Sequence, residues 1–297
     1  MNEIAVFIAQ HPVLLFLALS TCLLALCALL WQLVQRMRKP LWERGTALWQ
    51  RLTTAPRMQA LLQRHRWLRR RTPTAFAGGY LLLDLLAGFA LVAAALSLFL
   101  EIADEIGVDE TLGRFDNALA EALRQTLDDG TLQAFALLTR LGDVETLTLL
   151  CVAVAAVLLV RGKRLLAASW IAAVAGNGLL NRLLKGLFER SRPLHDHGWT
   201  LETSWSFPSG HSSGALVTYG MLAYLLSRAT PRIWHLPLTL LAIWIALLVG
   251  YSRIVLQVHF FSDVLAGFIS GATWLLVCIA SAEVVRAQLT RPTPEND

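Results

Sequence analysis

The sequence predicts an all-α, polytopic membrane protein, and two observations carry that prediction. Of the 297 residues, 56% are hydrophobic and only 16% are charged, and the mean hydropathy is +0.54. A soluble domain contains about 45–50% apolar and about 25% charged residues, so this apolar excess is too large for a buried core alone. The apolar residues also gather in seven stretches rich in Leu, Ala and Val without alternation. We therefore expect transmembrane helices rather than the strands of a barrel.

The seven stretches approach or exceed the length that a bilayer-spanning helix needs, which is roughly 17–25 residues. The third, fifth and seventh are short. No basic residue precedes the first stretch, and a basic block follows it, so we expect a retained anchor rather than a cleaved signal peptide. The stretches are Val13–Val34, Phe76–Leu100, Val144–Val160, Leu165–Leu184, Ser212–Leu226, Trp234–Gly250 and Val264–Ile279.

The distribution of Lys and Arg predicts the orientation, because cytoplasmic loops are enriched in positive charge. The segment from Arg36 to Arg71 holds eleven basic residues and one Glu. Two short turns are also basic, one around Lys163 and one with Arg228 and Arg232. If these three segments are cytoplasmic, the N-terminus lies outside and the C-terminus inside. The loops 101–130, 185–211 and 251–263 are then expected outside.

Four regions are expected: an N-terminal transmembrane anchor (1–35), a cytoplasmic basic segment (36–75), a six-helix domain (76–287) and a disordered tail (288–297). In the basic segment Trp and Leu interleave with Arg, which is typical of a surface helix on anionic lipid headgroups. The alternative is positive-inside charge without a specific partner. No groove-reading motif is present, so nucleic acid is not an expected partner. The four cysteines lie in apolar stretches and are interpreted as small hydrophobic residues.

Two of the loops expected outside hold side chains suited to binding a phosphate group. Lys185, Arg192 and Arg253 are cations near helix ends and together form a binding site for a dianion. A guanidinium group can bind two phosphate oxygens at once. Ser209 and Gly210 precede an apolar stretch. They therefore place backbone N–H groups of a helix N-terminus near these cations.

The same loops hold a candidate nucleophile. Asp263 follows His259 by four residues, a spacing that puts both side chains on one face of a helix. A carboxylate that binds one imidazole nitrogen leaves the lone pair of the other nitrogen available for attack. His211 is then a candidate for protonating the leaving oxygen.

These residues resemble the signature of the type 2 phosphatidic acid phosphatase superfamily. The signature consists of Lys, six residues and Arg-Pro; then Pro-Ser-Gly-His; then Ser-Arg, five residues, His, three residues and Asp. Every position is matched, by Lys185 to Pro193, Pro208 to His211 and Ser252 to Asp263. The resemblance implies a six-helix phosphatase core, preceded here by an extra N-terminal transmembrane helix.

The resemblance also implies phosphoryl transfer without a metal or cofactor. His259 would attack phosphorus and form a phosphohistidine, Asp263 would orient it, and His211 would protonate the leaving group and later activate water. Because Asp263 is committed to its histidine, too few carboxylates remain to hold a hard cation. The phosphoryl oxygens would be held by Lys185, Arg192, Arg253, Ser209 and the Gly210 amide.

The expected function is that of a membrane lipid phosphate phosphatase in the cell inner membrane, with its site on the periplasmic or extracellular side. Family members in bacterial membranes act on undecaprenyl pyrophosphate, phosphatidylglycerophosphate or phosphatidate, and an outward-facing site favours the first. One alternative is a phosphotransferase that passes the phosphoryl group to another lipid such as lipid A. Another is a non-enzymatic lipid-binding protein, although binding alone needs no oriented nucleophile. The sequence carries no signal for an oligomeric state.

Other polar residues receive structural interpretations. Arg190 lies outside the signature and is interpreted as ordinary surface charge. The segment Phe115–Leu127 is expected to be an amphipathic surface helix. Asn177, Asn181 and Arg182 are expected to form hydrogen bonds between helices, and substrate contact is the alternative. Asp84, an acid within an apolar stretch, is expected to pair with a neighbouring helix or a water pocket.

Overall fold

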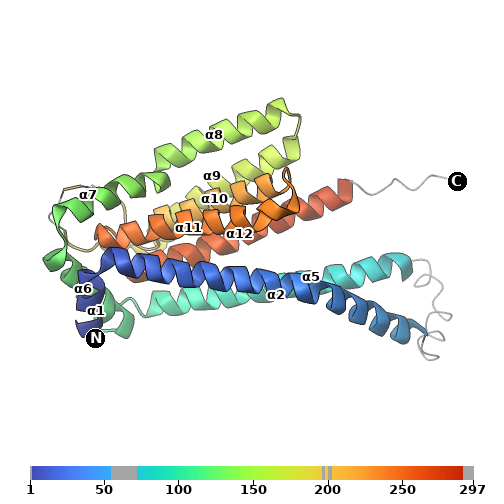
Figure 1. The fold of residues 1–297 in the computed structure, drawn as a ribbon, viewed down its shortest axis with the longest axis horizontal. Coiled ribbons are helices and arrows are strands. Elements are labelled where there is room, and N and C mark those ends of the chain that lie inside the picture. The colour runs from blue at the N-terminus through green and yellow to red at the C-terminus, as the bar shows by residue number, and fades with distance from the viewer. Residues whose placement is uncertain (1, 55–71, 196–197, 200–202, 290–297) are drawn as a thin grey trace. The chain divides into compact units, whose positions relative to one another are not determined.

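The computed structural model describes residues 2–54, 72–195, 198–199 and 203–289, and within these ranges it contains helices and no strand (Figure 1). The predicted all-α fold class is therefore confirmed. The helices are α1 (Asn2–Gln10), α2 (Pro12–Thr54), α5 (Thr72–Asp104), α6 (Thr111–Thr126), α7 (Asp129–Leu138), η1 (Thr139–Gly142), α8 (Val144–Val160), α9 (Arg164–Phe188), α10 (Gly210–Ser227), η2 (Arg232–Trp234), α11 (His235–Val255) and α12 (Phe261–Leu289).

Each predicted apolar stretch is helical, in α2, α5 and α8 to α12, with Trp234 in the short η2. Four helical stretches of the described chain are long and apolar enough to cross a membrane. The chain is thus a multi-pass membrane protein, whereas the seven-pass count remains a prediction. The four stretches are Pro12–Met37, Asp129–Val160, Arg232–Val255 and Phe261–Leu289.

The chain divides into two compact units, one of residues 1–24 with 95–297 and one of residues 25–94. Helix α2 continues to Thr54 across the predicted boundary at residue 35, since Arg, Met and Lys in that region favour helix. The predicted regions therefore stay predictions. Residues 55–71 of the basic segment, the tail from 290 and the side chain of Asp84 lie outside what the structure describes.

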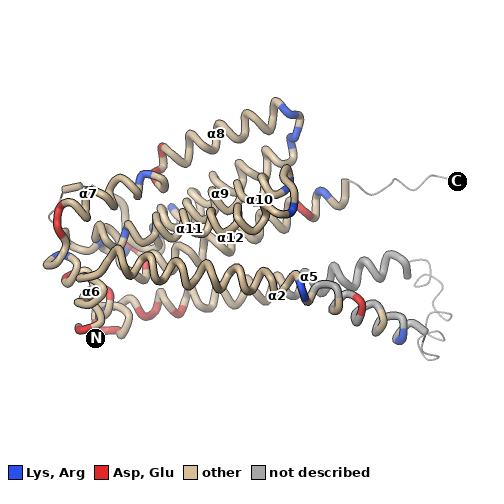
Figure 2. The backbone as a smooth tube through the Cα atoms, in the orientation of Figure 1, with Lys and Arg blue, Asp and Glu red and all other residues tan. Residues whose placement is uncertain are grey.

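Helix α10 packs against α9, α11 and α12 in the larger unit. The core between α9 and α10 contains Trp170, Ala173 and Met221, which are all fully buried. The indole N–H of Trp170 donates to the carbonyl oxygen of Cys151 at 2.9 Å, which ties α9 to α8. Figure 2 shows Lys, Arg, Asp and Glu gathered toward the two ends of these helices, as expected for segments whose middles lie in hydrocarbon.

Helices α1, α6 and α7 lie at one end of this bundle. Helix α1, which the sequence analysis did not predict, packs on α6 through Ala5 and Ala9 against Leu119 and Leu123. Asp128 caps α7 by accepting a 2.7 Å hydrogen bond from the Thr131 N–H. This end also contains the α9–α10 and α11–α12 loops, which hold the candidate site.

Candidate active site

A tight loop between α11 and α12 positions His259. Gln257 adopts the left-handed conformation with φ 51°. The N–H groups of Val258 and His259 both donate to the carbonyl oxygen of Arg253, each at 3.2 Å. This turn reverses the chain at the end of α11 and holds the imidazole in a buried position, 2% exposed.

The contacts of the two His259 nitrogens differ. The Nδ1 atom lies 3.3 Å from Oγ of Ser206 and 3.4 Å from Oδ2 of Asp263. The Nε2 atom lies 3.2 Å from Nη1 of Arg192. Polar partners of this kind at Nδ1 favour the tautomer with the proton on that nitrogen, which leaves the lone pair on Nε2.

Electrostatics keep this imidazole uncharged. Burial lowers the pKa of His259 well below its ordinary value, and the positive charges of Arg192, Arg253 and Lys185 lower it further. A neutral imidazole with a free lone pair is the form that a nucleophile requires.

Lys185 lies in the last turn of α9, and Arg192 lies in the connection between α9 and α10. The Nη1 of Arg192 donates to the Val258 carbonyl oxygen at 2.5 Å, and its Nε donates to the Ser204 carbonyl oxygen at 2.8 Å. The Nζ of Lys185 donates to the Trp205 carbonyl oxygen and to Oγ of Ser204. The loop thus gathers both cations beside His259.

His211 lies in the first turn of α10, and its Nε2 is 3.0 Å from Oδ1 of Asp143. Asp143 occupies the N-cap position of α8 but makes no capping hydrogen bond with its side chain. The carboxylate instead holds the His211 ring. The sequence does not predict this pairing, because an Asp directly before an apolar stretch is typical of an ordinary helix cap.

One cavity of about 610 Å³ joins these groups. Lys185, Arg192, His211 and His259 all line it, together with Gly210. The opposite wall is largely apolar and comes from α8 and α9, with Leu147, Cys151, Val152, Val174 and Ala175. The cavity therefore combines a cationic, imidazole-bearing end with a surface that suits an acyl or prenyl chain.

Three of the predicted site residues are absent from the described lining of this cavity. Asp263 lies behind His259. The Ser209 Oγ caps α10 by accepting from the Ser212 N–H at 3.4 Å, and the Ser209 N–H donates to the Asp263 carbonyl oxygen at 2.9 Å. Arg253 is buried and donates to Oγ1 of Thr139 at 3.2 Å. Phosphate contacts by Ser209 and Arg253 stay predictions.

The interpretation of Arg190 as surface charge is wrong. Its side chain is only 11% exposed and forms ion pairs with Asp263 at 2.6 Å and with Asp116 at 2.9 Å. The guanidinium also lies 4.1 Å from the ring centroid of Phe260. Burial raises the pKa of Asp116, and hydrogen bonds from Ser262 together with the charge of Arg190 oppose that rise. Helix α6, predicted as a surface helix, thus contributes a buried carboxylate behind the site.

The hydrogen bond predicted between helices is confirmed for Asn177, whereas Asn181 binds the loop that precedes α10. Nδ2 of Asn177 donates to Oγ of Ser213 at 3.3 Å, and Nδ2 of Asn181 donates to the Pro208 carbonyl oxygen at 3.4 Å. A Cβ atom added to Gly210 would lie 2.8 Å from Oδ1 of Asn181. The asparagines therefore hold the start of α10 against α9, where Gly210 allows a close approach.

A fold and a site of this kind define a helical membrane protein with a cavity lined by cations and imidazoles, and comparison with known proteins gives its family. Residues 164–286 match the PAP2 superfamily, the type 2 phosphatidic acid phosphatase superfamily that the motifs resemble. The structure is similar to the crystal structure of a transmembrane PAP2 type phosphatidylglycerolphosphate phosphatase from Bacillus subtilis, with a TM-score of 0.61 and 30% identity. That likeness covers 65% of this chain and 96% of the other. The chain belongs to the PAP2 superfamily.

Curated relatives carry phosphatase names. Phosphatidylglycerophosphatase B of Bacillus subtilis is 44% identical over 100 residues, which are 31% of this chain and 46% of that protein. Lipid A 1-phosphatase of Rhizobium johnstonii is 32% identical over 123 residues, which are 37% of this chain and 47% of that protein. The chain thus spans about half the length of the curated relatives it matches.

Proposed function

We propose that this protein is a membrane lipid phosphatase that hydrolyses a phosphate or pyrophosphate headgroup through a phosphohistidine at His259. The observation that carries the proposal is the cavity that His211, His259, Arg192 and Lys185 line together. The phosphatase names of the relatives support the same activity.

In the first step, the Nε2 lone pair of His259 attacks phosphorus and forms a P–N bond while the P–O bond to the leaving group breaks. Asp263 and Ser206 hold the proton on Nδ1, and His211 donates a proton to the leaving oxygen. Arg192 and Lys185 stabilise the charge on the equatorial oxygens, which is the main demand of phosphoryl transfer. Water then attacks phosphorus, His211 accepts its proton, and the P–N bond breaks to release phosphate.

The apolar wall of α8 and α9 supports a substrate that keeps its hydrocarbon chain in the membrane during the reaction. We propose that the site faces the outer side of the inner membrane, and for such a site undecaprenyl pyrophosphate is our first candidate. Phosphatidylglycerophosphate is the second candidate, because relatives in sequence and structure carry that name. Transfer of the phosphoryl group to a second lipid would use the same first step.

The test is phosphate release by the purified full-length protein in detergent with EDTA, using undecaprenyl pyrophosphate, phosphatidylglycerophosphate and phosphatidate in parallel. We expect turnover to persist in EDTA and His259→Ala to lower it at least about 1,000-fold, because the nucleophile is lost. His235→Ala, at the start of α11 and outside the described cavity lining, is the matched control and should retain turnover.

Near-normal turnover by a folded His259→Ala variant would contradict the mechanism, and loss of activity in EDTA would contradict metal independence. Labelled undecaprenyl pyrophosphate, incubated with and without lipid A, separates the two reactions. Label that appears mainly on lipid A would replace hydrolysis with phosphoryl transfer.

A further inference from the structure

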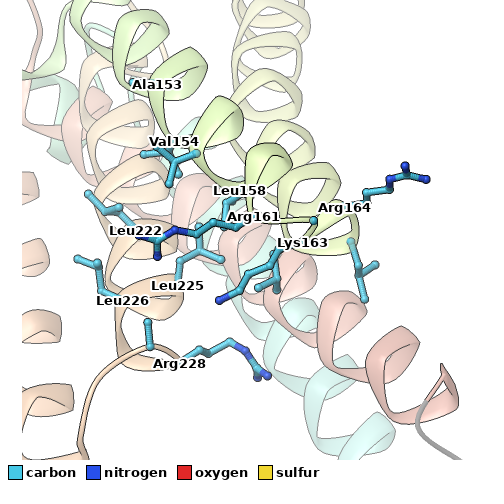
Figure 3. A pocket seen from close by; sticks show the side chains of 15 residues that line it. Ala153, Val154, Leu158, Arg161, Lys163, Arg164, Leu222, Leu225, Leu226 and Arg228 are labelled. Carbon is cyan, nitrogen blue, oxygen red and sulfur yellow. The ribbon is translucent and has the colours of Figure 1, made fainter.

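A second cavity, of about 660 Å³, lies where α8 turns into α9 and where α10 ends. Its inner wall is apolar and includes Val154 and Leu158 of α8 and Leu222 and Leu225 of α10 (Figure 3). Its rim is basic and is formed by Arg161, Lys163, Arg164 and Arg228.

The basic rim of this cavity is remote from the imidazole-bearing end of the candidate active site. Helix α8 starts beside Asp143, which contacts His211, and ends beside Arg161 at the rim. Its 17 residues rise about 26 Å, close to the roughly 30 Å thickness of the hydrocarbon core. The basic rim and the imidazole-bearing end of the active-site cavity therefore lie about one hydrocarbon thickness apart and cannot share one phosphate.

The rim is electrostatically positive. Figure 3 shows Arg161 and Lys163 extending across the mouth toward α10, with Arg228 on the other side, whereas Arg164 points away. Within the described chain, neither Arg161 nor Lys163 forms an ion pair or a side-chain hydrogen bond. Glu283 is shared, since both Arg228 and Arg286 donate to it at 2.5 Å. This carboxylate therefore does not neutralise both arginines.

Backbone groups add to the positive potential. Helix α9 starts at this rim, and its N-cap residue, Lys163, makes no capping hydrogen bond with its side chain. The N–H groups in the first turn of a helix have no intrahelical acceptor and attract anions. An anion at the mouth would thus meet the cations Arg161 and Lys163 and the positive end of a 25-residue helix.

We propose that this cavity binds an anionic phospholipid of the leaflet opposite the active site. The phosphate of the headgroup would lie between Arg161, Lys163 and the start of α9, and an acyl chain would occupy the apolar part beside Leu158 and Leu225. Basic pockets between transmembrane helices recognise anionic headgroups in this way. Charge placed only to orient the protein in the membrane needs no apolar pocket beneath it.

The test is a lipid titration of the full-length protein in detergent, followed by native mass spectrometry, with dioleoyl phosphatidylglycerol and dioleoyl phosphatidylcholine as probes. We expect tighter retention of phosphatidylglycerol by the wild type. The double substitution Arg161→Gln with Lys163→Gln should weaken that retention about 25-fold, because each cation near a lipid phosphate contributes on the order of a factor of five. Arg232→Gln, which removes an exposed cation outside the described lining of the cavity, is the control and should retain the preference.

A further arm separates a lipid from free phosphate. Ala153→Phe fills the apolar wall and leaves every cation in place. It should weaken phosphatidylglycerol binding severalfold, and inorganic phosphate at millimolar concentration should not displace the lipid. Preference for phosphatidylglycerol that survives the double substitution, no preference in the wild type, or full displacement by phosphate would each overturn the proposal. Unchanged melting temperatures establish that the variants are folded.

Discussion

His259 illustrates how a buried position controls chemistry at the scale of a single residue. Burial and the charges of Arg192, Arg253 and Lys185 depress its pKa below the ordinary value of 6.5. The imidazole is therefore neutral at any pH above that depressed value. The unfolded chain still binds a proton near pH 6.5, so this residue makes the free energy of unfolding fall as the pH drops below about 6.5.

We predict that the acid limb of the kcat/KM profile lies below pH 6.5, because protonation of His259 removes the lone pair. Lys185→Gln removes one of the cations that depress the pKa, so it should move the limb to higher pH as well as weaken turnover. Lys163→Gln, at the far end of the bundle, should leave the limb in place. A wild-type limb above pH 6.5 would contradict this account.

Arg190 binds two buried carboxylates, and its loss would leave both without their cation. We predict that Arg190→Gln lowers the free energy of unfolding by about 3–5 kcal/mol. Thermal unfolding in detergent measures the change. Arg124→Gln is the control, since Arg124 pairs with Glu121 on an exposed face and such a pair contributes only about 0–1 kcal/mol. Equal effects of the two substitutions would refute a special role for Arg190.

At the scale of elements, the start of α10 is held closely by its neighbours. A Cβ atom on Gly267 of α12 would lie 2.6 Å from the carbonyl oxygen of Ser209, a backbone atom that cannot rotate away. The same carbonyl accepts from the N–H of Ser213 at 3.2 Å in the first turn of α10. The position of His211 therefore depends on glycine in a different helix.

We predict that Gly267→Ala lowers the free energy of unfolding by about 1–3 kcal/mol, because α12 must move away from α10. Gly186→Ala in α9 is the matched control, since a Cβ atom there meets nothing within 4 Å. That change should be neutral or stabilise the protein by up to about 1 kcal/mol through helix propensity. Both are measured by thermal unfolding, and a Gly267→Ala variant as stable as the control would show that the contact relaxes freely.

At the scale of the whole molecule, the placement of charge predicts the topology. A variant without the native cysteines, which are all unpaired, provides the background for labelling. We predict that Ser191→Cys, in the α9–α10 connection, reacts with an impermeant thiol reagent added to intact cells. Ala229→Cys, after α10, should react only once the membrane is opened. The reverse pattern would place the candidate site on the cytoplasmic side.

The sequence predicts the long helices well, because each is a local run of apolar residues. The spacing of the motifs also predicts which residues form the candidate site. The sequence does not predict α1, a nine-residue helix that packs on α6 through Ala5 and Ala9. It also does not predict the partners of the site. Arg190 meets Asp116 from 74 residues away, and His211 meets Asp143 from 68 residues away.

The sequence by itself determined the helical membrane fold class and the family, because hydropathy and motif spacing are local properties that need no knowledge of distant contacts. Only the tertiary structure decided which side chains line the cavity, which carboxylates bind Arg190 and His211, and where the basic rim meets an apolar pocket. These features arise from packing between helices far apart in the chain. Arg190 and Arg192 look alike in sequence, yet Arg190 binds buried carboxylates whereas Arg192 lines the cavity.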